Sequence, residues 1–126
     1  MPDEHTADVL VVGSGIAGCA AALAAAREGA DVLVATKARR PEDASSDWAQ
    51  GGIATTRRDP EGLKRDIVAA SDGTADEDAV DVLVADAADA VEDVLVDTLG
   101  VPFDEDDDGF DYAREAAHSA ARILHV

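Results

Sequence analysis

The first 35 residues alternate short apolar runs with an alanine-rich segment, in the order that is typical of a βαβ unit. Residues 8–12 and 31–35 are β-branched and apolar, so each run fits a strand that is buried on both faces in a parallel sheet. Residues 15–28 between them are almost all helix formers, and Gly29 follows where a helix commonly ends in a glycine. The pattern therefore predicts a strand, a helix and a second strand, joined by a right-handed crossover.

Residues 36–56 interrupt this pattern, because they are polar, contain glycines and show no periodicity. A segment of this length without secondary structure is more often functional or disordered than a simple connection. A helix is then predicted through residue 70, with Asp59 as its N-cap and Pro60 at its first position.

A longer helix is predicted to end at Gly100, since apolar side chains recur at helical spacing and form one stripe. Its other face is acidic and is expected to be a solvated surface. Pro102 prevents the helix from resuming. The apolar stripe consists of Val80, Leu83, Ala87, Val91, Val94, Leu95 and Leu99.

The charge of the chain limits its possible partners. Its 126 residues carry a formal charge of −18, from 28 acidic against 10 basic side chains. So acidic a surface repels nucleic acid and anionic membranes, and we expect neither as a partner. It is typical of a halophilic protein in a salt-rich cytoplasm, where screening relieves self-repulsion. The acidic run 104–108 lacks the spaced ligands of a calcium loop, so a solvated turn is expected and no metal site is predicted.

Cysteine content and apolar run length bear on the compartment. Cys19 is the single cysteine, which excludes an internal disulfide and a cysteine-based zinc site. The chain begins with acidic residues rather than the basic region of a signal peptide. Its longest apolar run, residues 16–26, is shorter than the roughly 18 residues that cross a bilayer. We therefore expect a cytoplasmic protein.

A GxGxxG fingerprint follows the first predicted strand and opens the first predicted helix. Its first glycine permits the tight turn, its second lets backbone approach a pyrophosphate, and its third allows close packing of helix against strand. The N–H groups at the helix N-terminus then face the phosphates. The motif predicts dinucleotide binding by Gly13, Ser14, Gly15, Ile16, Ala17 and Gly18.

The acidic residue that usually ends the second strand of a nicotinamide site is absent. Thr36 and Lys37 stand there instead, and a carboxylate is what normally holds the ribose hydroxyls of NAD. This departure argues against NAD. Arg39 and Arg40 leave NADP open as an alternative, although they lie several residues further on.

A second glycine-rich segment, residues 44–54, combines a Gly-Gly turn with nearby hydroxyl and amide groups. Without Cβ atoms, backbone can lie directly against a flat ligand. The alternative is an ordinary surface loop that holds one tryptophan. The candidate ligand-binding residues of this segment are Ser45, Ser46, Asp47, Trp48, Ala49, Gln50, Gly51 and Gly52.

Four segments together resemble one enzyme family: GSGIAG, VATK, SSDWAQGGIA and DYAREAAHSAARILH. They resemble the N-terminal part of the L-aspartate oxidases, within the flavoprotein family of succinate dehydrogenase and fumarate reductase. The resemblance extends from Asp8 to His125. It implies an α/β fold, namely the N-terminal βαβ portion of a Rossmann-like FAD-binding domain with additional helices. Thr36 and Lys37 are usual at these positions in this family, so they agree with the resemblance.

The resemblance also implies how FAD is held. Its contacts would fall on residues 14–17, on Lys37 and on residues 45–52. In succinate dehydrogenase and fumarate reductase a histidine five residues before the glutamine links the flavin covalently. Ser45 takes that position here. The implied cofactor is therefore non-covalent FAD.

The REAAHS segment resembles the family's REGGHS segment, whose glutamate helps to orient L-aspartate. Glu115 takes the place of that glutamate, and Ala116 and Ala117 replace the two glycines. Arg114 and His118 are expected near the substrate, with Arg114 as an ion-pair neighbour of Glu115. A proton relay between His118 and the histidine at position 125 is a weaker alternative to two packed or surface histidines.

The function implied by the resemblance is oxidation of L-aspartate to iminoaspartate, with oxygen or fumarate as electron acceptor. This is the first step of de novo NAD biosynthesis, in which the product passes to quinolinate synthase. The catalytic arginine of the family lies downstream, so no catalytic residue is expected in this chain. We expect residues 1–126 to be a partial FAD-binding domain, without the capping and C-terminal helical domains. Two alternatives stay open: a respiratory flavoprotein subunit and a non-catalytic remnant.

Overall fold

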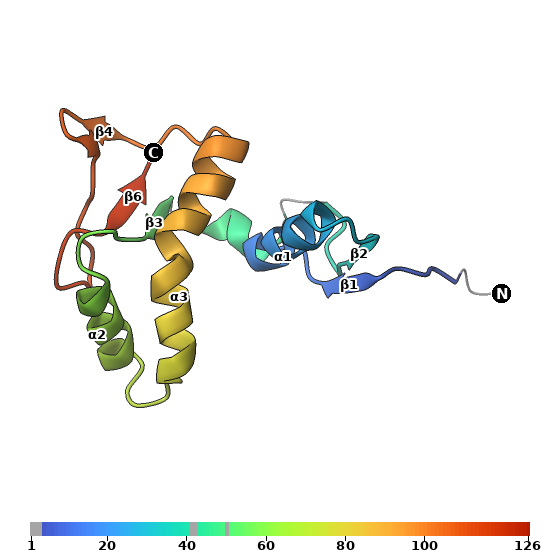
Figure 1. Cartoon of the computed structure of the whole chain (residues 1–126), viewed down its shortest axis with the longest axis horizontal. Helices are drawn as coiled ribbons and strands as arrows, with labels where there is room; N and C mark the ends of the chain where they lie inside the picture. The colour runs from blue at the N-terminus through green and yellow to red at the C-terminus, as the bar shows by residue number, and fades with distance from the viewer. Residues whose placement is uncertain (1–3, 41–42, 50) are drawn as a thin grey trace. The chain divides into compact units, whose positions relative to one another are not determined.

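The computed structural model describes residues 4–40, 43–49 and 51–126. The chain divides into two compact units, Met1–Gln50 and Gly51–Val126 (Figure 1). Each unit is described by itself. None of the described helices is long and apolar enough to cross a membrane.

The first unit is the βαβ unit that the apolar pattern predicts. Strand β1 (Val9–Val12) leads into helix α1 (Ile16–Arg27), which is followed by strand β2 (Val32–Ala35). The two strands are parallel, with Val9 opposite Val32 and Val12 opposite Ala35. Helix α1 packs against both strands.

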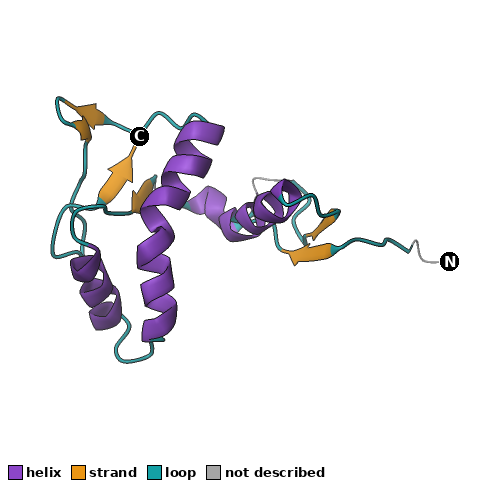
Figure 2. Ribbon diagram, in the orientation of Figure 1, coloured by secondary structure: helices purple, strands orange, loops and turns teal. Residues whose placement is uncertain are grey.

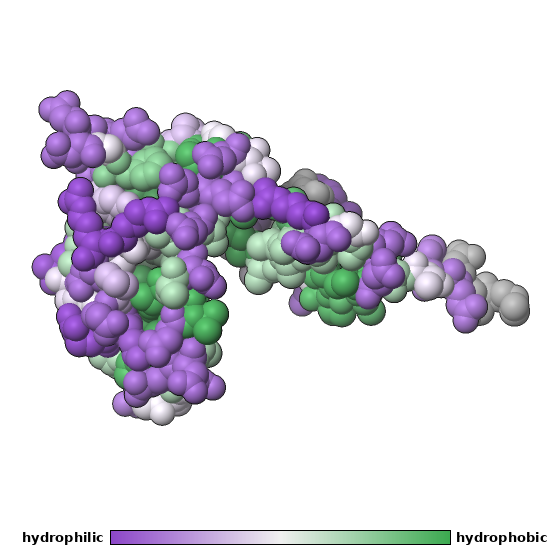
Figure 3. Space-filling model, in the orientation of Figure 1, coloured by the Kyte–Doolittle hydropathy of each residue, from purple (hydrophilic) through white to green (hydrophobic). Residues whose placement is uncertain are grey.

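The expectation that both strands are buried on both faces is wrong. Leu10 is 60% exposed, Val12 81% and Leu33 37%. Figure 3 shows apolar surface in the region of β1, α1 and β2. Among the described residues of this unit, α1 is the helix that packs on the two strands, so only one face of the sheet has a helical layer. A parallel sheet needs helices on both faces to bury its strands.

Residues 36–56 contain two elements that their composition does not indicate. They are the 3₁₀ helix η2 (Ser45–Trp48) and the strand β3 (Gly52–Ala54). Strand β3 belongs to the second unit, where it pairs antiparallel with β6 (Ile123–His125), and Gly52 lies opposite His125. A strand of three residues shows no periodicity, and its partner lies some 70 positions further along, so neither strand was predicted.

Two of the predicted helices form in the second unit (Figure 2). Helix α2 (Pro60–Ala70) begins as predicted, because the Asp59 carboxylate accepts the Gly62 N–H at 2.9 Å. Helix α3 (Glu77–Ala90) is capped by Asp76 and continues into the π-helical segment η3 (Val91–Thr98). The helices α2 and α3 pack side by side.

The core of this unit lies between α2 and α3. Leu63, Val80 and Val84 are buried there, and Ile67 packs against them. Part of the predicted apolar stripe is wrong, since Leu83 is 56% and Leu99 65% exposed. The face toward α2 is centred on Val80 and Val84 and leaves Leu83 outside. The π-helical turns place more residues per turn than an α-helix does, which shifts the phase of later positions such as Leu99.

The acidic run forms a solvated turn, as predicted. It carries the two-residue strands β4 (Glu105–Asp106) and β5 (Gly109–Phe110), which pair antiparallel. The Asp106 carboxylate accepts the Asp108 N–H at 2.8 Å and so closes the turn.

Candidate functional site

The GxGxxG turn has the backbone geometry that its glycines require. Gly13 has φ +111°, a region that favours glycine, and its N–H donates to the Ala35 carbonyl at 2.8 Å. A Cβ on Gly18 would collide with the carbonyl oxygen of Gly13. The first and third glycines are therefore needed for the turn and for the packing of α1 on β1.

A cavity of about 330 Å³ opens between this turn and the end of β2. Lys37 and Asp43 are the charged residues of its lining, and the Asp43 carboxylate accepts the N–H groups of Arg39 and Arg40 at 3.2 Å each. Lys37 forms no ion pair with a carboxylate of the described residues. The lining consists of Val12, Gly13, Ser14, Gly15, Ala35, Thr36, Lys37, Ala38, Asp43, Ala44 and Ser45.

The groups around this cavity are mostly hydrogen-bonding groups of small residues. Ser46 Oγ accepts the N–H of Ile16, the first residue of α1, at 2.9 Å. A Cβ on Gly15 would lie 3.2 Å from the same hydroxyl, a tight contact that the Ser46 side chain would have to shift to relieve. The side chain of Ser14 bonds that of Thr36 at 2.9 Å between oxygens. Backbone N–H groups, hydroxyls and the Lys37 cation together suit an anionic ligand.

The remaining predicted cofactor residues lie in different places. Ala17 is exposed in the first turn of α1, and Asp47, Trp48 and Ala49 are exposed and do not line the cavity. Gln50 lies outside the described residues. Gly51, with φ +73°, and Gly52 belong to the second unit.

The three predicted substrate residues share one turn of the second unit. Arg114 Nε donates to the His118 carbonyl at 3.0 Å, and the His118 N–H donates to the Glu115 carbonyl at 3.2 Å. Ala117 has φ +67°, although alanine disfavours this left-handed region. The expected ion pair between Arg114 and Glu115 is wrong. The geometry of the turn directs the Arg114 guanidinium to a backbone carbonyl instead.

Glu115 lies beside the Gly-Gly segment. Its Oε1 is 3.3 Å from the position that a Cβ on Gly52 would take. Gly52 pairs with His125 in β6, and the carbonyl and N–H of Ala113 both bond Ile123 of the same strand. The β3–β6 pair thus brings together the predicted flavin segment and the predicted substrate residue.

The histidine relay gains no support from this arrangement. Nδ1 of His125 pairs with the Asp104 carboxylate at 3.0 Å. Nδ1 of His118 is buried and has no hydrogen-bond partner among the described residues. The two histidines are not hydrogen-bonded to each other.

A buried arginine and its partners were not predicted from the sequence. Arg122 is 1% exposed and forms ion pairs with Asp59, at 3.0 Å, and with Asp66. Asp66 also accepts the N–H of Ser119 at 2.7 Å and its hydroxyl at 2.9 Å. The signal in the sequence is an arginine next to the apolar run 123–124, where an arginine requires a buried counter-ion.

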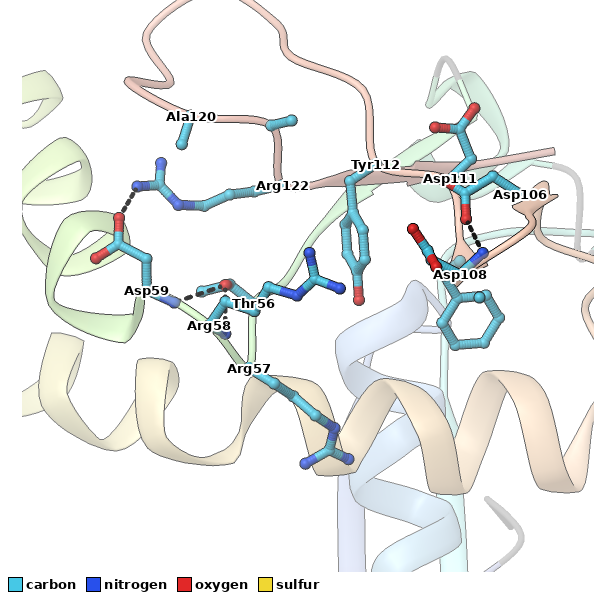
Figure 4. A pocket seen from close by; sticks show the side chains of 13 residues that line it. Thr56, Arg57, Arg58, Asp59, Asp106, Asp108, Asp111, Tyr112, Ala120 and Arg122 are labelled. Carbon is cyan, nitrogen blue, oxygen red and sulfur yellow. Dashed lines mark hydrogen bonds and ion pairs between the residues drawn. The ribbon is translucent and has the colours of Figure 1, made fainter.

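Arg122 also lines a larger cavity of about 640 Å³ (Figure 4). Its lining mixes both charges. Arg57 points away from the other arginines and pairs with Asp89 at 2.8 Å and with Glu92. The lining consists of Thr56, Arg57, Arg58, Asp59, Asp106, Asp108, Gly109, Phe110, Asp111, Tyr112, Ala120, Ala121 and Arg122.

Curated relatives match the chain along its length. It is 80% identical over 126 residues to an L-aspartate oxidase of Halobacterium salinarum, covering 100% of this chain and 25% of that protein. The halophilic source agrees with the acidic composition. An L-aspartate oxidase of Streptomyces coelicolor is 42% identical over 124 residues, covering 95% of this chain and 21% of that protein. The chain thus spans about a quarter of the length of these relatives.

Two solved structures share the fold. The Mycobacterium smegmatis Sdh1 complex in the apo form superposes with a TM-score of 0.85 at 27% identity, covering 97% of this chain and 21% of that one. The FrdA subunit of E. coli quinol fumarate reductase gives a TM-score of 0.79 at 29% identity, covering 94% and 21%. The family model described as "FAD binding domain" matches residues 8–126. The chain therefore belongs to the FAD-binding domain family, with the fold of the succinate dehydrogenase and fumarate reductase flavoproteins.

Proposed function

We propose that this chain is the N-terminal part of the FAD-binding domain of an L-aspartate oxidase. Its similarity to the Halobacterium salinarum L-aspartate oxidase supports this proposal. The activity would belong to a longer protein, since the chain covers a quarter of that relative. The exposed apolar residues of β1 and β2 support a sheet that further strands and helices complete in a Rossmann-like domain.

In the proposed reaction, L-aspartate loses a hydride from Cα and a proton from nitrogen and becomes iminoaspartate. FAD, when bound, supplies the acceptor for the hydride, and the two electrons pass on to oxygen or fumarate. Consumption of the product by quinolinate synthase stays a prediction.

The first unit would hold the cofactor. The N–H groups at the start of α1 and the Lys37 cation favour its phosphates, and the hydroxyls of Ser14, Thr36 and Ser46 supply polar partners. Ser45 lines the same cavity at the position where a histidine would form a covalent link. A serine there favours non-covalent FAD.

The closeness of the Glu115 carboxylate to Gly52 carries the substrate assignment. L-aspartate has two carboxylates and one ammonium group, and the Glu115 carboxylate can accept hydrogen bonds only from the ammonium. Arg114 and His118, in the same turn, offer groups that suit the substrate carboxylates. This arrangement would orient Cα of L-aspartate toward the FAD bound at the Gly-Gly segment.

The test uses the full-length protein that contains this chain. We expect L-aspartate, and not succinate, to reduce its bound flavin, and Glu115→Gln to raise KM for L-aspartate by about tenfold. Glu105→Gln, in the exposed β4–β5 hairpin, is the matched control and should leave KM unchanged. An E115Q enzyme with the KM of the wild type would overturn the role of Glu115.

A respiratory flavoprotein subunit is the second candidate, favoured by the TM-scores of 0.85 and 0.79 to such proteins. Reduction of the flavin by succinate would support it and would contradict L-aspartate oxidation. A purified full-length protein that holds no flavin would indicate the remnant instead.

A further inference from the structure

We propose that Asp66 is a positioning residue, which anchors the turn 114–119 so that Glu115 stays beside Gly52. The inference rests on the proposed function, because it assigns Asp66 a part in orienting L-aspartate through Glu115. Asp66 itself lies on α2 and touches neither residue in the described contacts.

One oxygen of Asp66 collects three donors. Oδ2 accepts the Ser119 N–H at 2.7 Å, the Ser119 hydroxyl at 2.9 Å and an Nη1 hydrogen of Arg122. The Asp66 side chain is 14% exposed and that of Arg122 1%. Bonds to an ionised carboxylate at such depth are stronger than neutral ones. The carboxyl-terminal side of the turn is therefore fixed to α2.

Helix α2 is a rigid support for this anchor. Leu63 and Ile67 of α2 pack into the core with Val80 and Val84 of α3. Leu63 and Ile67 flank Asp66 in the sequence of the same helix. A shift of Asp66 relative to the unit would therefore disturb the core.

A second attachment ties the same turn to the strand pair. The Ala113 N–H donates to the Ile123 carbonyl at 2.9 Å, and the Ile123 N–H donates back at 3.0 Å. Ile123 begins β6, whose His125 pairs with Gly52 in β3. The turn is thus held on one side by the strand partner of Gly52 and on the other by Asp66, and Glu115 lies between the two attachments.

The negative charge of Asp66 is the property that this arrangement uses. An asparagine has the same size but presents one neutral carbonyl oxygen to three donors and leaves Arg122 with Asp59 alone. Loss of the charge weakens all three bonds together. The turn then gains freedom, and a misplacement of about 1 Å at an orienting group can lower catalysis up to a hundredfold.

A purely structural role for Asp66 predicts a different pattern of kinetics. If Asp66 acts through Glu115, its removal has little further effect once Glu115 no longer orients the substrate. If it only stabilises the fold, the two substitutions act independently and their effects on KM multiply. A double-mutant cycle separates these cases.

The experiment measures KM and kcat for L-aspartate in four full-length enzymes: wild type, Asp66→Asn, Glu115→Gln and the double variant. We expect D66N to raise KM by about tenfold with bound FAD unchanged, and to add less than about twofold in the E115Q background. Asp81→Asn is the matched control. It removes the 2.6 Å ion pair with Lys64, and position 81 lies far from the turn 114–119 in the sequence. Its effect should be small and should multiply with that of E115Q.

Hydrogen exchange gives a readout that does not depend on activity. The Ser119 amide should exchange faster in D66N than in wild type or D81N. Ser119→Ala serves if D66N fails to fold, because it removes the hydroxyl donor to Asp66 together with a long bond of 3.4 Å that the same hydroxyl accepts from Arg122. It should raise KM by a smaller factor that also vanishes in E115Q. An unchanged KM, or effects that multiply with E115Q, would overturn the inference.

The same set of measurements separates the two proposals. A wild-type enzyme whose flavin L-aspartate does not reduce overturns the proposed function, and the role of Asp66 in orienting L-aspartate with it. A wild type that is reduced, with a D66N variant that behaves like D81N, overturns the positioning role alone.

Discussion

The Nη2 atom of Arg122 donates to Oδ2 of Asp59 at 3.0 Å, across 63 positions of the sequence. Oδ1 of the same carboxylate accepts the Gly62 N–H at 2.9 Å and so caps α2. One carboxylate therefore stabilises the start of a helix and neutralises a buried arginine that immediately precedes β6. A Cβ on Gly62 would collide with Asp59, which explains why a glycine stands inside the first turn of α2.

The two carboxylates that pair with Arg122 predict that the protein loses stability in acid. Hydrogen bonds from the Gly62 N–H and from Arg122 lower the pKa of Asp59, and bonds from the Ser119 N–H and hydroxyl and from Arg122 lower the pKa of Asp66 to about 2. In the unfolded chain both groups have a pKa of about 4. The stability that they contribute is therefore fully present above about pH 4 and is lost as the pH falls toward 2.

Urea denaturation of the full-length protein between pH 2 and 6 tests this window. The free energy of unfolding should fall more steeply below about pH 4 in wild type than in Asp66→Asn. Parallel curves for the two proteins would contradict the assignment. The control is Asp81→Asn, which should keep the wild-type slope.

Gly18→Ala should impair both the fold of the first unit and FAD binding. The added Cβ meets the Gly13 carbonyl oxygen, so α1 must move away from the turn. Overpacking of this kind costs about 1–3 kcal/mol. Flavin titration and thermal denaturation measure the two effects, and Ala20→Ser on the exposed part of α1 should change stability by less than about 0.5 kcal/mol. An unaltered flavin affinity in G18A would contradict the proposed cofactor site.

Ala117→Gly should stabilise the protein, whereas Ala116→Gly should destabilise it. Ala117 occupies the left-handed region at φ +67°, which costs an alanine about 1–2 kcal/mol. Glycine removes this cost, but it also makes the unfolded chain more flexible, which lowers the free energy of unfolding by about 0.4–1 kcal/mol. At position 116 only the second effect applies, because Ala116 does not occupy the left-handed region. Chemical denaturation should therefore rank A117G above wild type and A116G below it, and the reverse order would contradict the strained turn.

The flavin of the full-length protein should be released by acid precipitation. Ser45 lies in the cavity of the first unit, and a serine offers no imidazole nitrogen to form a bond with the isoalloxazine ring. All of the FAD should therefore appear in the supernatant, where fluorescence measures it. Flavin that stays with the precipitated protein would contradict non-covalent binding.

Local patterns were enough to predict the elements that depend on neighbouring residues. The βαβ order, the Asp59 cap of α2 and the acidic turn all follow from apolar spacing, helix caps and glycines within a few positions. The GxGxxG turn was predictable for the same reason, because Gly13 and Gly18 pack against each other within one short segment. The burial of β1 and the exposure of Leu83 were predicted wrongly, since burial depends on which other layers cover an element.

By itself, the sequence determined the local elements and, through its motifs, the resemblance to FAD-dependent enzymes. Only the tertiary structure placed Glu115 beside Gly52, and only it buried Arg122 between Asp59 and Asp66. These contacts join positions 56 to 63 residues apart, and no local spacing encodes them. They form because pairing of β3 with β6 and packing of α2 on α3 bring the groups together, and a buried charge then requires a partner at that place.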